Sequence, residues 1–160
     1  MTGFPAKHVA NIFLQRDFQA NQATISPMKL QKLVYMAHGW NLAINASPAI
    51  DSHFEAWPYG PVEDDLYHIF KTFRNNPIKE YALDYSGPEK SAYVVNQSKN
   101  PSFYNVIDLV CTKYLRFSAE QLSAMTHQQG TPWSQVRANG GGVIPNQLIA
   151  DHFRSLVLNK

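Results

Sequence analysis

Hydrophobic residues recur at helical spacing along most of the chain, and the clearest case is the stretch 26–45. Ser26 and Pro27 suit a helix start, because serine can accept a hydrogen bond from a free backbone N–H and proline has no N–H to lose. Apolar residues then follow at intervals of three and four on one face, namely Leu30, Leu33, Val34, Ala37 and Trp40. Around the rest of this helix, we expect Lys29 and Lys32 to face solvent in a narrow stripe. The pattern therefore predicts a central helix with neighbours on several sides.

The same spacing predicts further helices over about 5–18, 61–73, 102–117, 118–127 and 131–136, and one after 145. Ser118 with Gln121 forms a capping-box pattern, and Thr131 is a cap candidate before Pro132. The first helix is expected to turn Lys7, Asn11 and Gln15 away from the core. The last is expected to bury Leu148, Ile149, Phe153, Leu156 and Val157.

Two segments lack the helical pattern. Residues 53–57 alternate as a short strand would, and the following Pro-Tyr-Gly-Pro breaks the chain. Residues 75–101 are polar and interrupted by Pro77, Gly87 and Pro88, and we expect a hairpin or a mobile loop there, with Tyr93 to Val95 as a possible strand. Together the patterns predict a mainly α, compact single-domain fold over 1–160, with about six to seven helices and a small β-hairpin or short strands.

Composition adds little to this picture. The formal charge of +2 on 160 residues is too mild to indicate nucleic-acid binding, and no stretch is long and apolar enough to span a membrane. A lone cysteine, Cys111, lies in an apolar helical pattern, where an inert buried thiol is the ordinary interpretation. Residues 1–5 lack the features of a secretion signal, so the expected location is the cytoplasm.

No constellation of residues predicts catalysis or metal binding. The six histidines are scattered, without the close pairs that metal sites use. The triple glycine 140–142 lacks the lysine and hydroxyl of a phosphate-binding loop. Glu63, Asp64 and Asp65 are adjacent acids of a first helical turn, where the helix dipole alone favours them. We therefore expect no catalytic residue, no metal and no cofactor.

Three motifs occur in order along the chain. They are Leu-Gln-Lys-Leu-Val-Tyr at 30–35, Ala-Trp-Pro-Tyr-Gly-Pro-Val at 56–62, and Ser-x-x-x-Leu at 118–122 followed by His127 and Pro132-Trp133. With an amphipathic helix before them and an Ile-Pro-led helix after them, they make the chain resemble the Panacea domain family, also called SocA-like or phage-associated GepA-like proteins. The resemblance covers almost the whole chain.

This resemblance implies a helical domain that binds a partner protein, either as an antitoxin that neutralises a toxin or as an adaptor that delivers a protease substrate. The positions considered for partner binding are Tyr59, Gly60, Pro61, His127 and Trp133. Tyr59 is the best surface candidate, because it lies between two prolines in a turn and tyrosine is enriched at interface hot spots. The positions considered structural are Leu30, Leu33, Tyr35, Trp40, Trp57 and Pro132.

Structural roles compete with partner contact at several of these positions. Gly60 and Pro61 can simply shape a tight turn, His127 can hydrogen-bond the turn near Thr131, and Trp133 can belong to the core. Two other function classes stay open. One is a hydrolase that uses His127 with an acid from 63–65; the other is nucleic-acid binding through Lys29 and Lys32 near Arg74.

Overall fold

A computed structural model describes residues 3–85 and 89–158, and within these ranges the fold is mainly α, as predicted. The helices are α1 (Ala6–Gln19), α2 (Pro27–Asn45), α3 (Asp64–Phe70), α4 (Pro101–Tyr114), α5 (Ala119–His127), α6 (Pro132–Ala138) and α7 (Asn146–Leu158), with a 3₁₀ turn η1 (Lys71–Phe73) after α3. The strands are β1 (Phe54–Trp57), β2 (Gly60–Val62) and β3 (Val143–Ile144).

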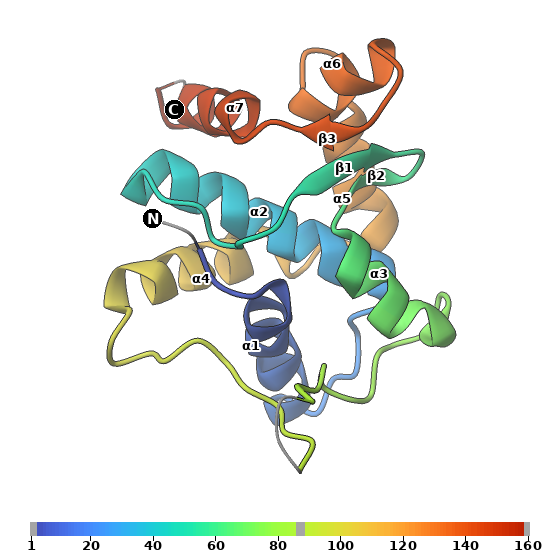
Figure 1. Cartoon of the computed structure of the whole chain (residues 1–160), viewed down its shortest axis with the longest axis vertical. Helices are drawn as coiled ribbons and strands as arrows, with labels where there is room; N and C mark the ends of the chain where they lie inside the picture. The colour runs from blue at the N-terminus through green and yellow to red at the C-terminus, as the bar shows by residue number, and fades with distance from the viewer. Residues whose placement is uncertain (1–2, 86–88, 159–160) are drawn as a thin grey trace.

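Helix α2 is the centre of the molecule, which confirms the main prediction from the hydrophobic pattern. It packs against α1, α3, α4, α5, α7 and β2, and Figure 1 shows it running between α7 on one side and α1 and α4 on the other. Gly39 allows the closest approach, because a Cβ atom there would overlap the ring of Phe153 in α7. The expected solvent stripe of Lys29 and Lys32 is wrong, since both side chains are buried.

The helix caps predicted at Ser26, Ser118 and Thr131 are present, whereas α4 begins at Pro101, before the predicted start at 102, and has no side-chain cap. The Ser26 hydroxyl accepts a hydrogen bond from the Lys29 backbone N–H at 3.3 Å. Ser118 and Gln121 form the complete capping box, in which each side chain accepts from the backbone N–H of the other. The Thr131 hydroxyl accepts from the Ser134 N–H at 3.2 Å, with Pro132 in the first turn. These local signals fix where α2, α5 and α6 begin.

The short sheet differs from the prediction on both sides of β1. Strand β1 lies in the middle and pairs antiparallel with β2 and with β3. Residues 61 and 62 were expected to open a helix, but with Gly60 they form β2, and α3 begins only after the cap residue Glu63. Proline fits this edge strand because it needs no N–H for the ladder. Strand β3 was not predicted, since two residues carry no periodicity of their own.

The segment between η1 and α4 forms little regular structure in the residues described. It contains one isolated bridge, between Asp84 and Ser91, and the expected strand at 93–95 does not form. Asn11 holds the segment against α1: its side-chain amide pairs with both backbone groups of Ala82 and donates to the carbonyl of Tyr93. Asn11 is thus buried rather than exposed as predicted. The expected breaks at Gly87 and Pro88 lie outside the described residues.

Helix α7 buries Ile149, Ala150 and Phe153 as its inner face. Leu156 and Val157 continue the hydrophobic spacing but remain 39% and 42% exposed, so their predicted burial is wrong. The buried face ends at Phe153, and the final turn lies in solvent. No helix in the described part of the chain has the length and apolar character of a membrane span.

Candidate functional site

The three sequence motifs meet in space around the β1–β2 turn, residues 57–60. The first motif lies on α2, the second forms the turn itself, and the third spans α5 and the start of α6 (Figure 1). Carbonyl groups in a tight turn lack partners within the sheet, so other parts of the chain must satisfy them. Side chains of the third motif region lie against these carbonyls, and side chains of the first motif hold the chain that follows the turn.

On one side, Gln31 and Lys32 of α2 hold the chain that follows the turn. The Gln31 amide makes a two-way pair with the backbone of Glu63, accepting from its N–H and donating to its carbonyl, each at 2.9 Å. Lys32 Nζ donates to the Pro61 carbonyl at 3.2 Å. The Glu63 carboxylate in turn accepts from the Leu66 N–H at 2.9 Å and caps α3, while burial raises its pKa.

On the other side, side chains of α5 and α6 face three successive carbonyls of the turn, and two of these carbonyls, those of Trp57 and Tyr59, accept hydrogen bonds. Trp133 Nε1 donates to the Trp57 carbonyl at 2.6 Å, His127 Nε2 lies 3.0 Å from the Pro58 carbonyl, and the Ser123 hydroxyl donates to the Tyr59 carbonyl at 2.7 Å. The rings of His127 and Trp133 also pack together, with centroids 3.9 Å apart. The turn is therefore held rigidly from outside the sheet.

His127 has a structural role, but its partners differ from those predicted. Its Nδ1 lies 2.6 Å from the Ser123 carbonyl, one helical turn earlier, and its Nε2 reaches Pro58 rather than the neighbourhood of Thr131. Sequence reasoning did not single out Ser123, and it included Gln31 only as a member of the motif at 30–35. The spacing of Ser123 and His127, four residues apart on one helix, was the available signal.

Gly60 is required at its position for two reasons. Its φ of +117° is one that side-chain-bearing residues rarely adopt, and a Cβ atom there would lie 2.7 Å from Lys32 Cε. Gly60 and Pro61 are both buried, so their burial favours the turn-shaping role. Tyr59, at the tip of the same turn, is 69% exposed, as the sequence predicted.

The other motif residues divide by burial. Leu30, Leu33, Tyr35 and Trp40 are buried in the core on α2, Pro132 is buried at the start of α6, and Trp57 and Trp133 are half-buried. The Trp40 Nε1 donates to the Tyr114 hydroxyl at 2.9 Å, which satisfies its polar atom inside the core. Whether Tyr59, Gly60, Pro61, His127 or Trp133 touches a partner stays a prediction.

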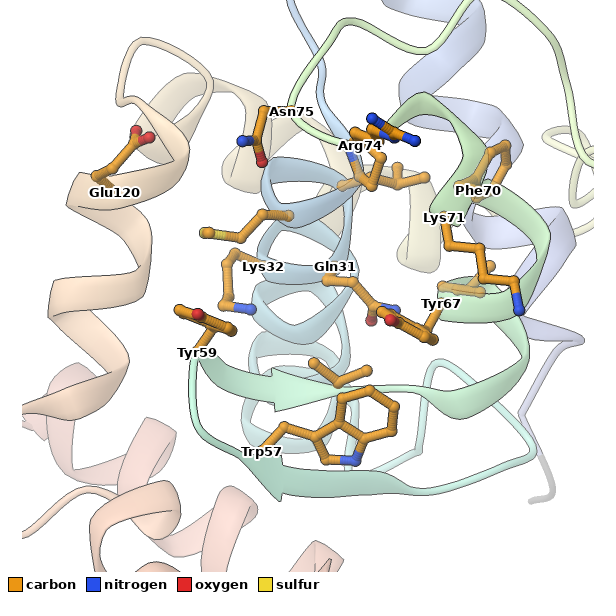
Figure 2. Close-up of a pocket in the computed structure, with 15 residues that line it drawn as sticks. Gln31, Lys32, Trp57, Tyr59, Tyr67, Phe70, Lys71, Arg74, Asn75 and Glu120 are labelled. Atoms are coloured by element: carbon orange, nitrogen blue, oxygen red, sulfur yellow. The ribbon is translucent and has the colours of Figure 1, made fainter.

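Beside the turn lies a cavity of about 610 Å³, which we call the α2–α3 groove. Its lining comes from α2, the β1–β2 hairpin, α3, η1 and the two residues after it, and Glu120 of α5. Figure 2 shows Gln31 and Lys32 on α2, Tyr59 and Trp57 on the hairpin, and Glu120 facing the groove from the side opposite Lys71. Residues of the first two motifs therefore contribute both to the turn and to the groove next to it.

The electrostatics of the groove are dominated by cations. Lys32 is fully buried, and burial lowers its pKa from 10.5 to about 7. Among the described residues, no carboxylate forms a salt bridge with it. Lys71 and Arg74 line the groove as exposed cations, against Glu120 as the one acidic side chain of the lining. Arg74 has the unusual backbone angles φ 56° and ψ −117°, the kind of strain that concentrates at functional sites.

The structure does not bring together the residues of the two alternative sites, the hydrolase site and the nucleic-acid site. Neither ring nitrogen of His127 contacts a carboxylate in the described part of the chain, so the predicted pairing with the acids at 63–65 is absent. Burial of Lys29 and Lys32 removes the basic surface expected for nucleic acid.

The residues described contain no cluster of three or more potential metal ligands. Cys111 is half-buried, and burial raises the pKa of its thiol.

Comparison with known proteins relates the chain to one family. The family model described as "Antitoxin SocA-like, Panacea domain" matches residues 30–134, a range that contains all three motifs. The chain is also 35% identical over 161 aligned residues to the Antitoxin SocA of Caulobacter vibrioides (strain NA1000 / CB15N). That alignment covers 93% of this chain and 82% of the relative. No solved structure matches the chain.

Proposed function

Because the chain belongs to the SocA-like Panacea family of antitoxins, we propose that it is an antitoxin that neutralises a partner toxin by binding it directly. The observation that carries this proposal is the 35% identity to an antitoxin over nearly the full chain. We place its action in the cytoplasm. In an adaptor version of the same proposal, the chain delivers the bound toxin to a protease. This version requires the same first step, binding of the toxin.

The structure supports a binding role through the rigid presentation of Tyr59. Hydrogen bonds from Trp133 and Ser123 hold the backbone of the turn, His127 Nε2 lies against the Pro58 carbonyl, and the Tyr59 side chain stays in solvent. A side chain displayed on a preformed turn loses little conformational entropy on binding. Tyrosine also offers a large apolar face and a polar tip, which is why it recurs at hot spots.

The test is an affinity pull-down of the tagged chain from its native cells, followed by expression of each bound protein alone and together with this chain. We expect one stoichiometric partner that stops growth alone and is harmless with the chain. A protease as the main companion favours the adaptor version. A folded chain that captures no partner contradicts the proposal.

Tyr59→Ala tests the role of the turn. The side chain is 69% exposed, so its removal should leave the melting temperature unchanged and weaken partner binding about tenfold or more, as for other hot-spot tyrosines. Tyr93→Ala is the matched control, since Tyr93 is also exposed but lies in the segment before α4, outside the groove. If Tyr59→Ala unfolds the protein, Tyr59 is structural; if it binds the partner like wild type, the turn is not the contact.

A further inference from the structure

A smaller cavity, of about 200 Å³, lies between α2, α7 and the connector from α5 to α6, and we call it the α2–α7 pocket. It shares no lining residue with the α2–α3 groove, so neither that groove nor the β1–β2 turn explains it. We propose that the α2–α7 pocket binds an uncharged phenol-like group, an aromatic ring whose oxygen atom forms a hydrogen bond with the Tyr35 hydroxyl. This inference goes beyond the proposed function and does not depend on it.

The first support is the hydroxyl of Tyr35, a residue of α2 that lines the pocket. Three tyrosines are buried in the described part of the chain. The Tyr104 hydroxyl donates to the Val95 carbonyl at 2.7 Å, and the Tyr114 hydroxyl accepts from Trp40 Nε1 at 2.9 Å. The Tyr35 hydroxyl has no such partner among the described residues, although Tyr35 is only 3% exposed. Because a buried polar group without a partner is costly, a ligand that supplies the partner gains affinity.

The Tyr35 oxygen is accessible from the pocket. Edge-to-face contacts with Phe54 and Phe153, at centroid distances of 5.2 and 5.8 Å, hold the Tyr35 ring. Among the buried side chains of the described residues, Ser52 Oγ is the one polar atom that is both sealed from solvent and unpartnered. The unpartnered Tyr35 oxygen therefore keeps some accessible surface, and this surface faces the pocket that Tyr35 lines. Burial raises the pKa of the phenol, so the hydroxyl keeps its proton and can donate or accept.

The second support is the chemistry of the lining, which contains no Asp, Glu, Lys or Arg among the described residues. His152 also lines the pocket, and burial lowers the pKa of its ring, which therefore stays neutral at pH 7. A charged ligand would lose its hydration here without gaining an opposite charge. Met36, Met125 and Phe153 contribute apolar surface, and methionine sulfur makes favourable contacts with aromatic rings. The lining therefore favours an uncharged aromatic group.

The third support is the size of the pocket and its access to solvent. An apolar protein cavity of about 150 Å³ holds one benzene molecule, so about 200 Å³ accommodates a benzene ring with a small polar substituent. A drug-sized ligand needs more room, since its pockets span about 300–1,000 Å³. Gln128 and Leu156 belong to the lining and are both exposed, so the pocket opens to solvent.

p-Cresol and toluene provide a matched pair of probes, because they differ only in the hydroxyl group. Titration of isotope-labelled protein, followed by NMR at pH 7, measures the binding of each. We expect p-cresol to cause saturable shifts in the amide signals of the lining residues at 125–131. Tyr35→Phe should fold, because the hydroxyl that it removes has no partner in the protein. It should weaken p-cresol binding about three- to tenfold, the value of one neutral hydrogen bond, and leave toluene binding unchanged.

Tyr104→Phe is the matched control for Tyr35→Phe, since Tyr104 is also buried but lies outside the pocket. It should bind both probes like wild type. Benzoate is a second control, because it has the same ring but is charged at pH 7, and it should not bind.

A second pair of variants keeps the test independent of Tyr35. Leu156 and Val157 are 39% and 42% exposed, so a larger side chain should be tolerated at both, but only Leu156 lines the pocket. Leu156→Trp should lose both probes, and Val157→Trp should bind them like wild type. Circular dichroism confirms that each variant is folded.

Four results would overturn the proposal. They are no saturable binding of p-cresol, equal p-cresol binding by Tyr35→Phe and wild type, benzoate binding as tight as that of p-cresol, and wild-type binding of p-cresol by folded Leu156→Trp.

A free small molecule and a tyrosine side chain of the partner protein both offer a phenol, and a pull-down from native cells distinguishes these sources. If folded Leu156→Trp loses the toxin that wild type and Val157→Trp capture, the pocket holds a partner side chain. If all three proteins capture the toxin, the pocket serves a free molecule. If wild type captures no toxin, the antitoxin proposal fails, while the titration still decides this inference.

Discussion

Replacing Lys32 with methionine should stabilise the folded protein. Lys32 occupies a fully buried position on the central helix, and methionine has a similar length without the charge. A buried charge without a paired carboxylate opposes folding, because its hydration in the unfolded chain is lost. The substitution removes that cost and keeps most of the packing.

The magnitude follows from the pKa of Lys32, which burial lowers from 10.5 to about 7. Each pKa unit corresponds to about 1.4 kcal/mol, so keeping the ammonium form in the folded state costs about 5 kcal/mol at most. The variant leaves the Pro61 carbonyl without its donor, a loss of about 1–3 kcal/mol. We expect a net gain of about 2–4 kcal/mol in the free energy of unfolding below pH 7.

Urea unfolding as a function of pH measures this gain and its sign. The folded-state pKa lies below the unfolded one, so between about pH 7 and 10.5 the unfolded state binds more protons and wild type gains stability as pH rises. Below pH 7 the amine is charged in both states and the cost is constant. The advantage of Lys32→Met should therefore be largest at pH 6 and shrink toward pH 10. A variant less stable than wild type at pH 6 would refute the reasoning.

Three further predictions concern the core. Leu33→Ala and Trp40→Ala should each lower the free energy of unfolding by about 2–5 kcal/mol, and an unchanged melting temperature would contradict the central position of α2. Gly39→Ala should cost about 1–3 kcal/mol in urea unfolding, since its methyl group overlaps the Phe153 ring. Burial lowers the pKa of His38 from 6.5 to about 4, so stability present above pH 6.5 should fall by about 3 kcal/mol on acidification to pH 4. A flat profile in that window, compared with His38→Gln, would contradict it.

Local signals predicted the helices well, while long-range polar contacts escaped sequence reasoning. The Ser26, Ser118 and Thr131 caps act within one turn, so the sequence contains all that is needed to find them. The burial of Lys29 and Asn11 depends on carbonyl groups more than seventy positions away along the chain, at Leu115, Ala82 and Tyr93. Polarity alone therefore placed both side chains in solvent.

Only those features of the candidate site that depend on neighbouring residues in the sequence could be predicted. A tyrosine between two prolines indicated an exposed tip, and Tyr59 is exposed. Pro61 is ambiguous, because proline suits both a first helical turn and an edge strand, and pairing with β1 decides for the strand. The α2–α3 groove exists only where α3 and the hairpin meet α2, an arrangement that no local pattern contains.

Growth of cells that express the captured partner, with and without this chain, tests the central claim most directly. The account predicts that the partner alone arrests growth, that wild type restores it, and that Tyr59→Ala, although folded, restores it less well. Arrest that persists when folded wild-type chain is present in excess would contradict the claim that this protein neutralises a toxin by direct binding.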